Sequence, residues 1–164
     1  MKYKSQHEFT HHQADKIGIL VSNLGTPEAA TTPALRRYLA QFLSDPRVVE
    51  VPRILWKMIL HGVILRIRPA RSAKAYQTVW TDEGSPLMIH TKNQAQRLAE
   101  YFANKGSHYE VAFAMRYGQP SVSNALDELL QKGVRKLVVL PLYPQYSAAT
   151  TGSTFDAIAD DFKT

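Results

Sequence analysis

The stretch RKLVVLPLYPQYSAATTGSTFDAI at residues 135–158 contains a nearly continuous hydrophobic run, then a turn rich in tyrosine and proline, then a helical pattern. Such a run is typical of a strand that is buried on both faces of a parallel sheet. The hydroxyl-rich residues that follow favour a helix beginning around Thr150 or Thr151. The stretch therefore predicts one strand-turn-helix unit.

Two earlier runs have the same character. IGILVSNLG at residues 17–25 is again nearly continuous and predicts another strand buried on both faces, and YEVAFAMRYG at residues 109–118 predicts a third strand. Each run is followed by a turn and a helical period. This alternation predicts an α/β fold with an open parallel sheet flanked by helices, a three-layer, Rossmann-like lobe.

Helices are expected where start signals precede apolar periodicity, at residues 31–45, 52–69, 91–106 and 120–133. Thr91 is the expected cap of the third of these helices. The segment PRILWKMILHGVILRIRP at residues 52–69 is apolar on nearly every side, so it is either deeply buried or forms an exposed apolar lip. It is too short to span a bilayer.

Composition favours one compact domain. The chain has 164 residues, of which 45% are hydrophobic. Residues 1–16 are polar and predict a flexible leader without signal-peptide character, and residues 17–164 predict the folded lobe. The absence of cysteine excludes disulfides and thiolate metal sites, which makes a cytoplasmic location the natural expectation.

A net charge of +6 and a pI near 9.6 indicate an acidic partner. Nucleic acid, an anionic membrane surface and a carboxylate-bearing small molecule all fit that charge. The basic residues concentrate inside the apolar segment, at Arg53, Lys57, Arg66, Arg68, Arg71 and Lys74. This placement favours a ligand or a membrane surface, whereas nucleic-acid binding is an alternative that rests on the pI alone.

Ligands of open α/β sheets bind beyond the carboxyl ends of the strands. Candidate segments are residues 22–28, 116–120 and 143–153, and the turn at residues 82–87. None contains a dinucleotide fingerprint or a phosphate loop, which disfavours nucleotide binding. TTGS at residues 150–153 allows either an anion site or simple N-capping, and capping is favoured.

Three groups of side chains in or near these segments have two interpretations each. Arg116 with Tyr117 forms a ligand-binding pair, or the arginine pairs structurally with a helix-borne carboxylate. Tyr143 and Tyr146 form either a platform for a flat ligand or part of the core. The basic residues after position 67 either receive carboxylates or form a solvated face. The six histidines have no ligand-like spacing, so no metal site is expected in this chain.

Four motifs together, NLGTPE, AYQTVWTDEGSPL, FAMRYGQPS and LPLYPQYSAATTGS, resemble the ferrochelatase family in order and spacing. The resemblance covers residues 17–164 and extends only to the N-terminal half of that family. It implies a chelatase-like lobe, one of two around a porphyrin cleft. The family's reaction is a lyase step of haem biosynthesis, insertion of ferrous iron into protoporphyrin IX to form protohaem.

The resemblance also implies site residues. Asn23 and Leu24 are expected to face the macrocycle, Arg116 and Tyr117 to lie near the face that receives metal, and Tyr143 and Tyr146 to wall the cleft. Arg68, Tyr76 and Ser85 match positions near the propionates or the cleft mouth. The apolar lip, residues 53–67, matches a hydrophobic surface for porphyrin entry, with a cytoplasmic location peripheral to the inner membrane.

Departures from the family pattern limit these expectations. Leu24 replaces the Met or Tyr of other members, and Ala148 replaces a cysteine that ligates an iron-sulfur cluster in animal enzymes. No cofactor is therefore expected, and ferrous iron is a substrate. The family's catalytic histidine, in HSLP, and its acidic partner belong to the second half and are absent here.

Two readings of the chain follow from that absence. Either it is the N-terminal lobe that works with a C-terminal lobe, or it is a non-catalytic porphyrin-binding fragment. In both cases the isolated chain is expected to be inactive, without catalytic residues of its own. The choice between protoporphyrin and coproporphyrin as substrate stays open.

Overall fold

The computed structural model describes residues 3–4, 12, 15–106 and 108–163. Its strands β1 (Lys16–Gly25), β2 (Tyr109–Tyr117) and β3 (Val134–Pro141) form one parallel sheet with the order β2-β1-β3. The order places the first strand of the sequence at the centre. The expected open parallel sheet is confirmed.

Strand β1 is hydrogen-bonded on both sides, and Leu20 and Val21 at its middle are almost completely buried. Its continuous hydrophobic run therefore matches its position. The prediction that β3 is buried on both faces was wrong, because its side chains Val138 and Leu140 are 52% and 44% exposed. Strand β3 pairs only with β1 among the described residues, and no described helix covers that face of it.

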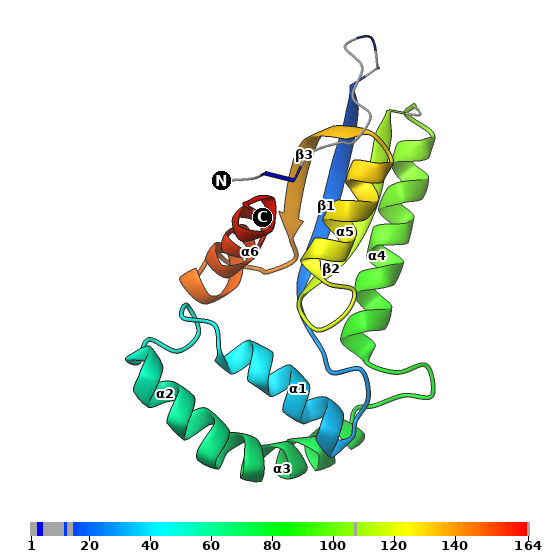
Figure 1. The fold of residues 1–164 in the computed structure, drawn as a ribbon. Coiled ribbons are helices and arrows are strands. Elements are labelled where there is room, and N and C mark those ends of the chain that lie inside the picture. Colours follow the sequence, from blue (N-terminus) through cyan, green and yellow to red (C-terminus); the bar gives the residue numbers. More distant parts are fainter. Residues whose placement is uncertain (1–2, 5–11, 13–14, 107, 164) are drawn as a thin grey trace.

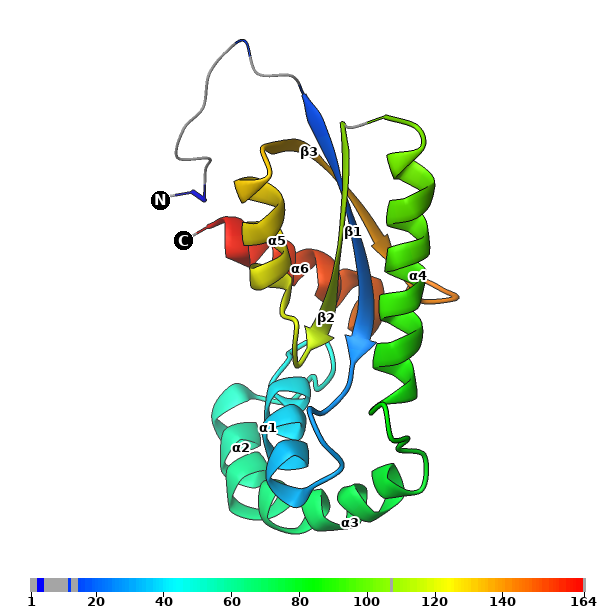
Figure 2. The ribbon, with the colours of Figure 1, turned by 90° about the vertical axis from the view of Figure 1, so that its right-hand side faces the viewer.

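Helices cover both faces of the sheet (Figure 2), which confirms the three-layer arrangement. Helix α4 (Pro86–Ala103) lies on one face, and helices α5 (Val122–Gln131) and α6 (Ser153–Phe162) lie on the other. The core on the second side joins Leu20 of β1 to Leu126 and Leu129 of α5 and Ile158 of α6. Burial of these side chains is the main stabilising contribution to the layer.

A second group of helices lies beyond the carboxyl ends of the strands (Figure 1). It comprises α1 (Thr32–Leu43), α2 (Arg53–Ile59), the π-helical turn η1 (Leu60–Ile64) and α3 (Leu65–Gln77). Leu35, Leu39, Leu60 and Leu65 pack with Tyr117 at the end of β2 in a separate core. These helices therefore form a cap over the edge of the sheet where ligands are expected.

The prediction that Thr91 is the N-cap residue of α4 was wrong. The helix begins at Pro86 with Ser85 as its N-cap residue, so Thr91 lies inside the helix. Thr91 is fully buried, and its hydroxyl donates to the carbonyl of Leu87 at 2.7 Å. Such a bond to the preceding turn satisfies a buried threonine without ending the helix.

Helical structure in the last segment begins at Ala148, close to the expected start around Thr150 or Thr151, but its first turn is not α-helical. A π-helical turn η2 (Ala148–Gly152) precedes α6, and Ser147 and Thr150 cap it reciprocally. The Thr150 hydroxyl is occupied by Ser147, and the Thr154 hydroxyl donates to the Thr150 carbonyl at 3.1 Å. The hydroxyls therefore serve the local backbone, as the capping interpretation requires.

The apolar segment is an exposed lip. Its outward side chains, with exposed fractions from 38% to 80%, are Ile54, Leu55, Met58, Ile59, Val63 and Ile67. Trp56 anchors the lip to α1, since its indole nitrogen donates to the Leu43 carbonyl at 2.6 Å. Helical structure continues to Gln77, eight residues past the expected end, with Pro69 inside α3. Among the described residues, no helix is long and apolar enough to cross a membrane.

Most of the predicted leader, residues 1–16, lies outside the described residues, and its boundary stays a prediction. Lys4 is described, and its ammonium lies 2.8 Å from a carboxylate oxygen of Asp161 and 2.8 Å from one of Asp127. Its backbone nitrogen donates to the Phe162 carbonyl at 3.2 Å. Residue 4 thus contacts α5 and α6.

Candidate functional site

A cavity of about 360 Å³ lies where β1 ends. Three residues singled out in the sequence, Leu24, Tyr76 and Ser85, line it together although 61 positions separate the first from the last. The rings of Tyr76 and Trp80 approach with centroids 6.2 Å apart. The result is an apolar and aromatic hollow with a phenol and a serine hydroxyl, a surface suited to a flat ligand.

The exit of β1 is held tightly in place beside this cavity. Gly25 has a φ of 109°, and a Cβ at this position would lie 1.8 Å from the carbonyl oxygen of Tyr117. The next residue, Thr26, donates from its buried hydroxyl to Ser85 at 2.8 Å. The glycine thus lets two strand ends touch, and the hydroxyl pair connects β1 to the start of α4.

Asn23 and Leu24 are oriented differently. The amide nitrogen of Asn23 donates to the Thr91 hydroxyl at 2.9 Å, and its amide oxygen accepts from the Leu24 backbone nitrogen at 2.8 Å. These bonds direct Asn23 toward α4, while Leu24 lines the cavity. The structure therefore brings only the second of this pair to the cavity wall.

Arg116 and Tyr117 form a buried polar cluster with Asp45. The guanidinium of Arg116 lies 2.6 Å from the Asp45 carboxylate, and the Tyr117 hydroxyl donates to the same carboxylate at 2.8 Å. Arg116 thus has a structural carboxylate partner, as its alternative interpretation required, although Asp45 lies just beyond the end of α1 and not on a helix. Tyr117 is 1% exposed, so its ring packs in the core under the cap of helices.

Burial and charge shift the pKa values in this cluster. Burial alone would raise the pKa of Asp45, but the hydrogen bonds that its carboxylate accepts and the nearby guanidinium hold that pKa below its ordinary value. Burial is the main cause that raises the pKa of Tyr117. Asp45 is therefore ionised, and Tyr117 neutral, throughout the physiological range.

The two tyrosines of the expected ledge occupy different environments. Tyr143 is half-buried, and burial raises the pKa of its phenol. Its hydroxyl is enclosed and has no well-formed hydrogen bond within the described part of the chain. Tyr146 is 75% exposed. The first ring therefore belongs partly to the core, and only the second is a fully open surface.

The basic residues after position 67 lie on α3. Arg68, Arg71 and Lys74 are exposed, and the helix continues through Pro69, so their spacing of three places them along one side. Tyr76 of the same helix reaches the cavity, but Arg68 does not line it. The three basic residues thus lie on the same helix as a residue of the cavity wall, but they do not form part of that wall.

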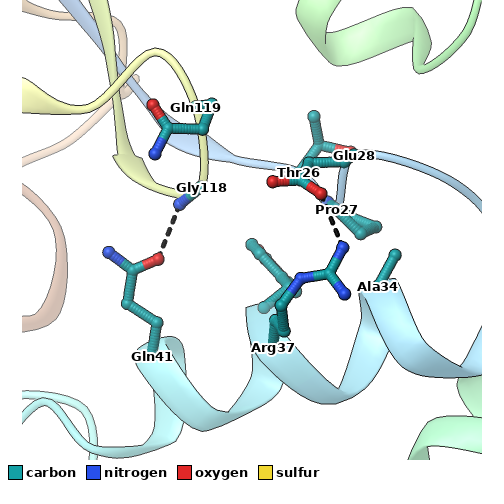
Figure 3. A pocket seen from close by; sticks show the side chains of 9 residues that line it. Thr26, Pro27, Glu28, Ala34, Arg37, Gln41, Gly118 and Gln119 are labelled. Carbon is teal, nitrogen blue, oxygen red and sulfur yellow. Dashed lines mark hydrogen bonds and ion pairs between the residues drawn. The ribbon is translucent and has the colours of Figure 1, made fainter. Parts of the chain in front are cut away.

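A second cavity of about 200 Å³ lies between α1 and the turns that follow β1 and β2 (Figure 3). Glu28 and Arg37 pair across its mouth at 2.6 Å. The Gln41 side chain accepts a hydrogen bond from the Gly118 backbone nitrogen at 2.8 Å. These two pairs connect α1 to the turns after β1 and β2, so we interpret this cavity as a contact region between elements.

Two residues of these clusters were not among the site residues expected from the sequence. Gln41 and Asp45 are four apart, at the end of α1 and just beyond it, and both reach the end of β2. The i, i+4 spacing next to a helix end was the one available clue.

Among the histidines that the structure describes, none lines either of these two cavities. His7 and His11 lie outside the described residues. In the part of the chain that the structure describes, no group of three or more histidines, aspartates and glutamates has a geometry that could hold a metal ion.

Comparison with known proteins gives a consistent match. The family model for ferrochelatase matches residues 16–164. The ferrochelatase of Idiomarina loihiensis is 64% identical over 163 residues, which cover 99% of this chain and 45% of that protein. Those of Marinobacter nauticus and Pseudoalteromonas atlantica are 60% and 62% identical over 99% and 98% of this chain, and over 44% and 45% of their own lengths. The chain thus spans less than half the length of these relatives.

Proposed function

The chain belongs to the ferrochelatase family, and from that premise we propose that it is the N-terminal lobe of an enzyme that inserts ferrous iron into protoporphyrin IX to form protohaem. Its length relative to the three bacterial ferrochelatases supports a partner lobe in the remainder of such a protein. The substrates are then the porphyrin and ferrous iron, with no resident cofactor.

The observation that carries this proposal is the cavity at the end of β1. Leu24, Tyr76 and Trp80 supply apolar and aromatic surface, and Ser85 supplies a hydroxyl at its wall. A porphyrin is a large apolar disc with carboxylates at one edge, so it requires this combination. The cavity is smaller than the disc, and we place only one edge of the macrocycle in it.

Other predicted site residues would act around that edge. We assign Tyr143 and Tyr146 to the wall near the exposed turn, and Arg68 to the approach of the propionates, for which an exposed guanidinium is suited. Arg116 and Tyr117 would contribute from below the wall, where both are held by Asp45. Asn23 would support Leu24, whose backbone nitrogen it binds.

A binding role without turnover is the second candidate for this chain alone. The residues that line the cavity at the end of β1 include no imidazole and no carboxylate. Metal insertion must remove two pyrrole protons, and general acid-base help is worth roughly 10² to 10⁴ in rate. We therefore propose that the proton-accepting groups come from the partner lobe.

The apolar lip supports a peripheral membrane location. Six large apolar side chains are exposed along α2, η1 and the start of α3, with basic residues beside them. Such a surface is suited to the interface of an anionic bilayer. We propose that the protein is cytoplasmic and contacts the inner membrane through this lip, where an apolar porphyrin would enter.

The test uses full-length enzyme and the 164-residue chain side by side. We expect ferrous or zinc insertion, followed by porphyrin absorbance, only with the full-length enzyme. Trp80→Ala should weaken porphyrin binding by about tenfold because it removes one aromatic wall. Tyr101→Ala, at an exposed aromatic position near the end of α4, is the matched control.

Two results would oppose the proposal. Insertion by the mass-verified 164-residue chain would show that the proton-accepting groups are within it. Equal porphyrin affinity of the Trp80→Ala and Tyr101→Ala variants would remove the cavity at the end of β1 from the binding site.

A further inference from the structure

Asp45 connects three parts of the chain that are far apart in the sequence. Besides its bonds with Arg116 and Tyr117 at the end of β2, its carboxylate accepts from the Ser153 hydroxyl at 2.6 Å and from the Arg47 backbone nitrogen at 2.7 Å. It therefore holds together the α1–α2 connection, the end of β2 and the first residue of α6. Its side chain is only 4% exposed.

The same contacts fix one orientation of the Arg116 guanidinium. Its Nε donates to the Ser153 carbonyl at 2.9 Å and to the Ser153 hydroxyl at 2.6 Å, and its Nη2 donates to Asp45. The guanidinium carbon lies 4.5 Å from the centre of the Tyr117 ring. Nη1 makes no hydrogen bond with any described residue. The side chain as a whole is 17% exposed, and Nη1 is the nitrogen whose donors have no partner among those residues.

We propose that Asp45 is a positioning residue that aims Arg116, so that the free edge of the guanidinium faces the ligand bound beyond the carboxyl ends of the strands. The inference rests on the proposed function, because it takes that ligand to be the porphyrin undergoing metal insertion. Asp45 itself, enclosed by its four donors, does not touch the substrate.

Attaching helices α1 to α3 to the end of the sheet does not by itself require a buried charge at position 45. Gln41, one turn earlier, already connects α1 to the end of β2, because its side chain accepts a hydrogen bond from the Gly118 backbone nitrogen (Figure 3). A buried carboxylate loses hydration, and the loss is compensated only by close partners. Beyond the connection made by Gln41, Asp45 therefore adds bonds with the hydroxyls of Tyr117 and Ser153, and it neutralises and fixes the guanidinium. Of these additions, only the last requires a charge.

The experiment compares four variants of the full-length enzyme by kcat for metal insertion, porphyrin KM and thermal midpoint. Asp45→Asn and Arg116→Gln should each lower kcat by about ten- to a hundredfold, the range expected when a supporting contact or a positioned group is lost. Asp45→Asn should also lower the midpoint, since it leaves Arg116 buried without its counter-charge.

The double variant Asp45→Asn/Arg116→Gln separates positioning from structural support. We expect it to regain most of the midpoint, because no unpaired charge remains, while its kcat stays as low as that of Arg116→Gln alone. Gln41→Met is the matched control, and it should lower the midpoint slightly and leave kcat unchanged.

Three results would overturn the inference. They are wild-type kcat in Arg116→Gln, recovery of kcat together with the midpoint in the double variant, and a double variant far slower than Arg116→Gln. The comparison of kcat between the double variant and Arg116→Gln tests the inference even if Asp45→Asn does not fold. Absence of insertion by the wild-type enzyme would instead contradict the proposed function itself.

Discussion

Arg36 on α1 donates from its Nε to the carbonyl oxygen of Leu65 on α3 at 3.0 Å. Leu65 precedes Pro69 by four residues, and proline has no N–H to donate to that carbonyl within the helix. The arginine therefore replaces the missing helical donor and fastens α3 to α1. This contact shows how α3 runs through a proline and still carries Tyr76 to the cavity at the end of β1.

Replacing Arg36 by Ala should lower the free energy of unfolding by about 1 kcal/mol, because the Leu65 carbonyl loses its donor. In a Pro69→Ala background the cost should shrink, since the new backbone N–H can supply the helical bond. Urea unfolding of the four proteins measures the coupling. Arg37→Ala, which breaks an exposed pair with Glu28, should cost almost nothing. Equal costs of Arg36→Ala in both backgrounds would refute the replacement.

Gly25 and Gly84 provide a matched pair for the exit of β1. Both have a φ of 109°, but an added Cβ meets the Tyr117 carbonyl at 1.8 Å only at Gly25, and nothing lies within 4 Å of it at Gly84. Gly84→Ala should cost about 1 kcal/mol from backbone strain. Gly25→Ala should cost several times more and reduce soluble yield. Similar thermal midpoints for the two variants would contradict the close strand contact.

The stability that Asp45 provides should depend on pH in one direction. Its pKa in the folded protein is lowered, so its contribution is complete above the unfolded value of about 4 and is lost as the pH falls through the lower folded value. The difference in unfolding free energy between the wild type and Asp45→Asn should be constant from pH 7 to about 5 and shrink below about pH 4. Asp160→Asn, at an exposed position, is the control; a difference that grows in acid would reverse the sign argued here.

The basic side of α3 should attract acidic ligands. In the full-length enzyme, the triple variant Arg68→Glu/Arg71→Glu/Lys74→Glu should raise the porphyrin KM and reduce binding to anionic liposomes, with the wild-type binding declining as salt is added. A matched reversal of the exposed residues Lys92 and Arg97 of α4 and Lys105 just after that helix changes the net charge equally. If both triple variants behaved alike, or if the α3 variant behaved as the wild type, the local role of α3 would be rejected.

Much of the fold could be predicted because it depends on local periodicity. The buried run of β1 and the strand-turn-helix order indicated a parallel sheet before any contact was known. The cavity at the end of β1 was partly predictable for the same reason, since Leu24 follows a strand and Ser85 lies in a turn. The exposed state of the lip was not predictable, because an all-apolar helix has the same pattern whether it is buried or open.

The rest depends on partners that are distant in the sequence. A carboxylate partner was one of the two interpretations of Arg116, but Asp45 is 71 residues away, and nothing in the sequence identified it as that partner. Thr91 has the residue type of a helix cap, yet α4 begins earlier, at Pro86, and the Thr91 hydroxyl inside the helix accepts a hydrogen bond from Asn23. Propensity identified the type of element in these cases, and tertiary contacts decided its boundary and its bonds.

Strand β3 pairs with β1 along one side only, within the described chain, and exposes Val138 and Leu140 beside that unpaired edge. An apolar strand edge with free backbone donors and acceptors is a template on which another strand can add. Material limited to these 164 residues should therefore be handled as an aggregation-prone sample. Association through the edge of β3 will limit the concentration at which this material stays in solution. Val138→Lys should raise that concentration limit without a change in the thermal midpoint.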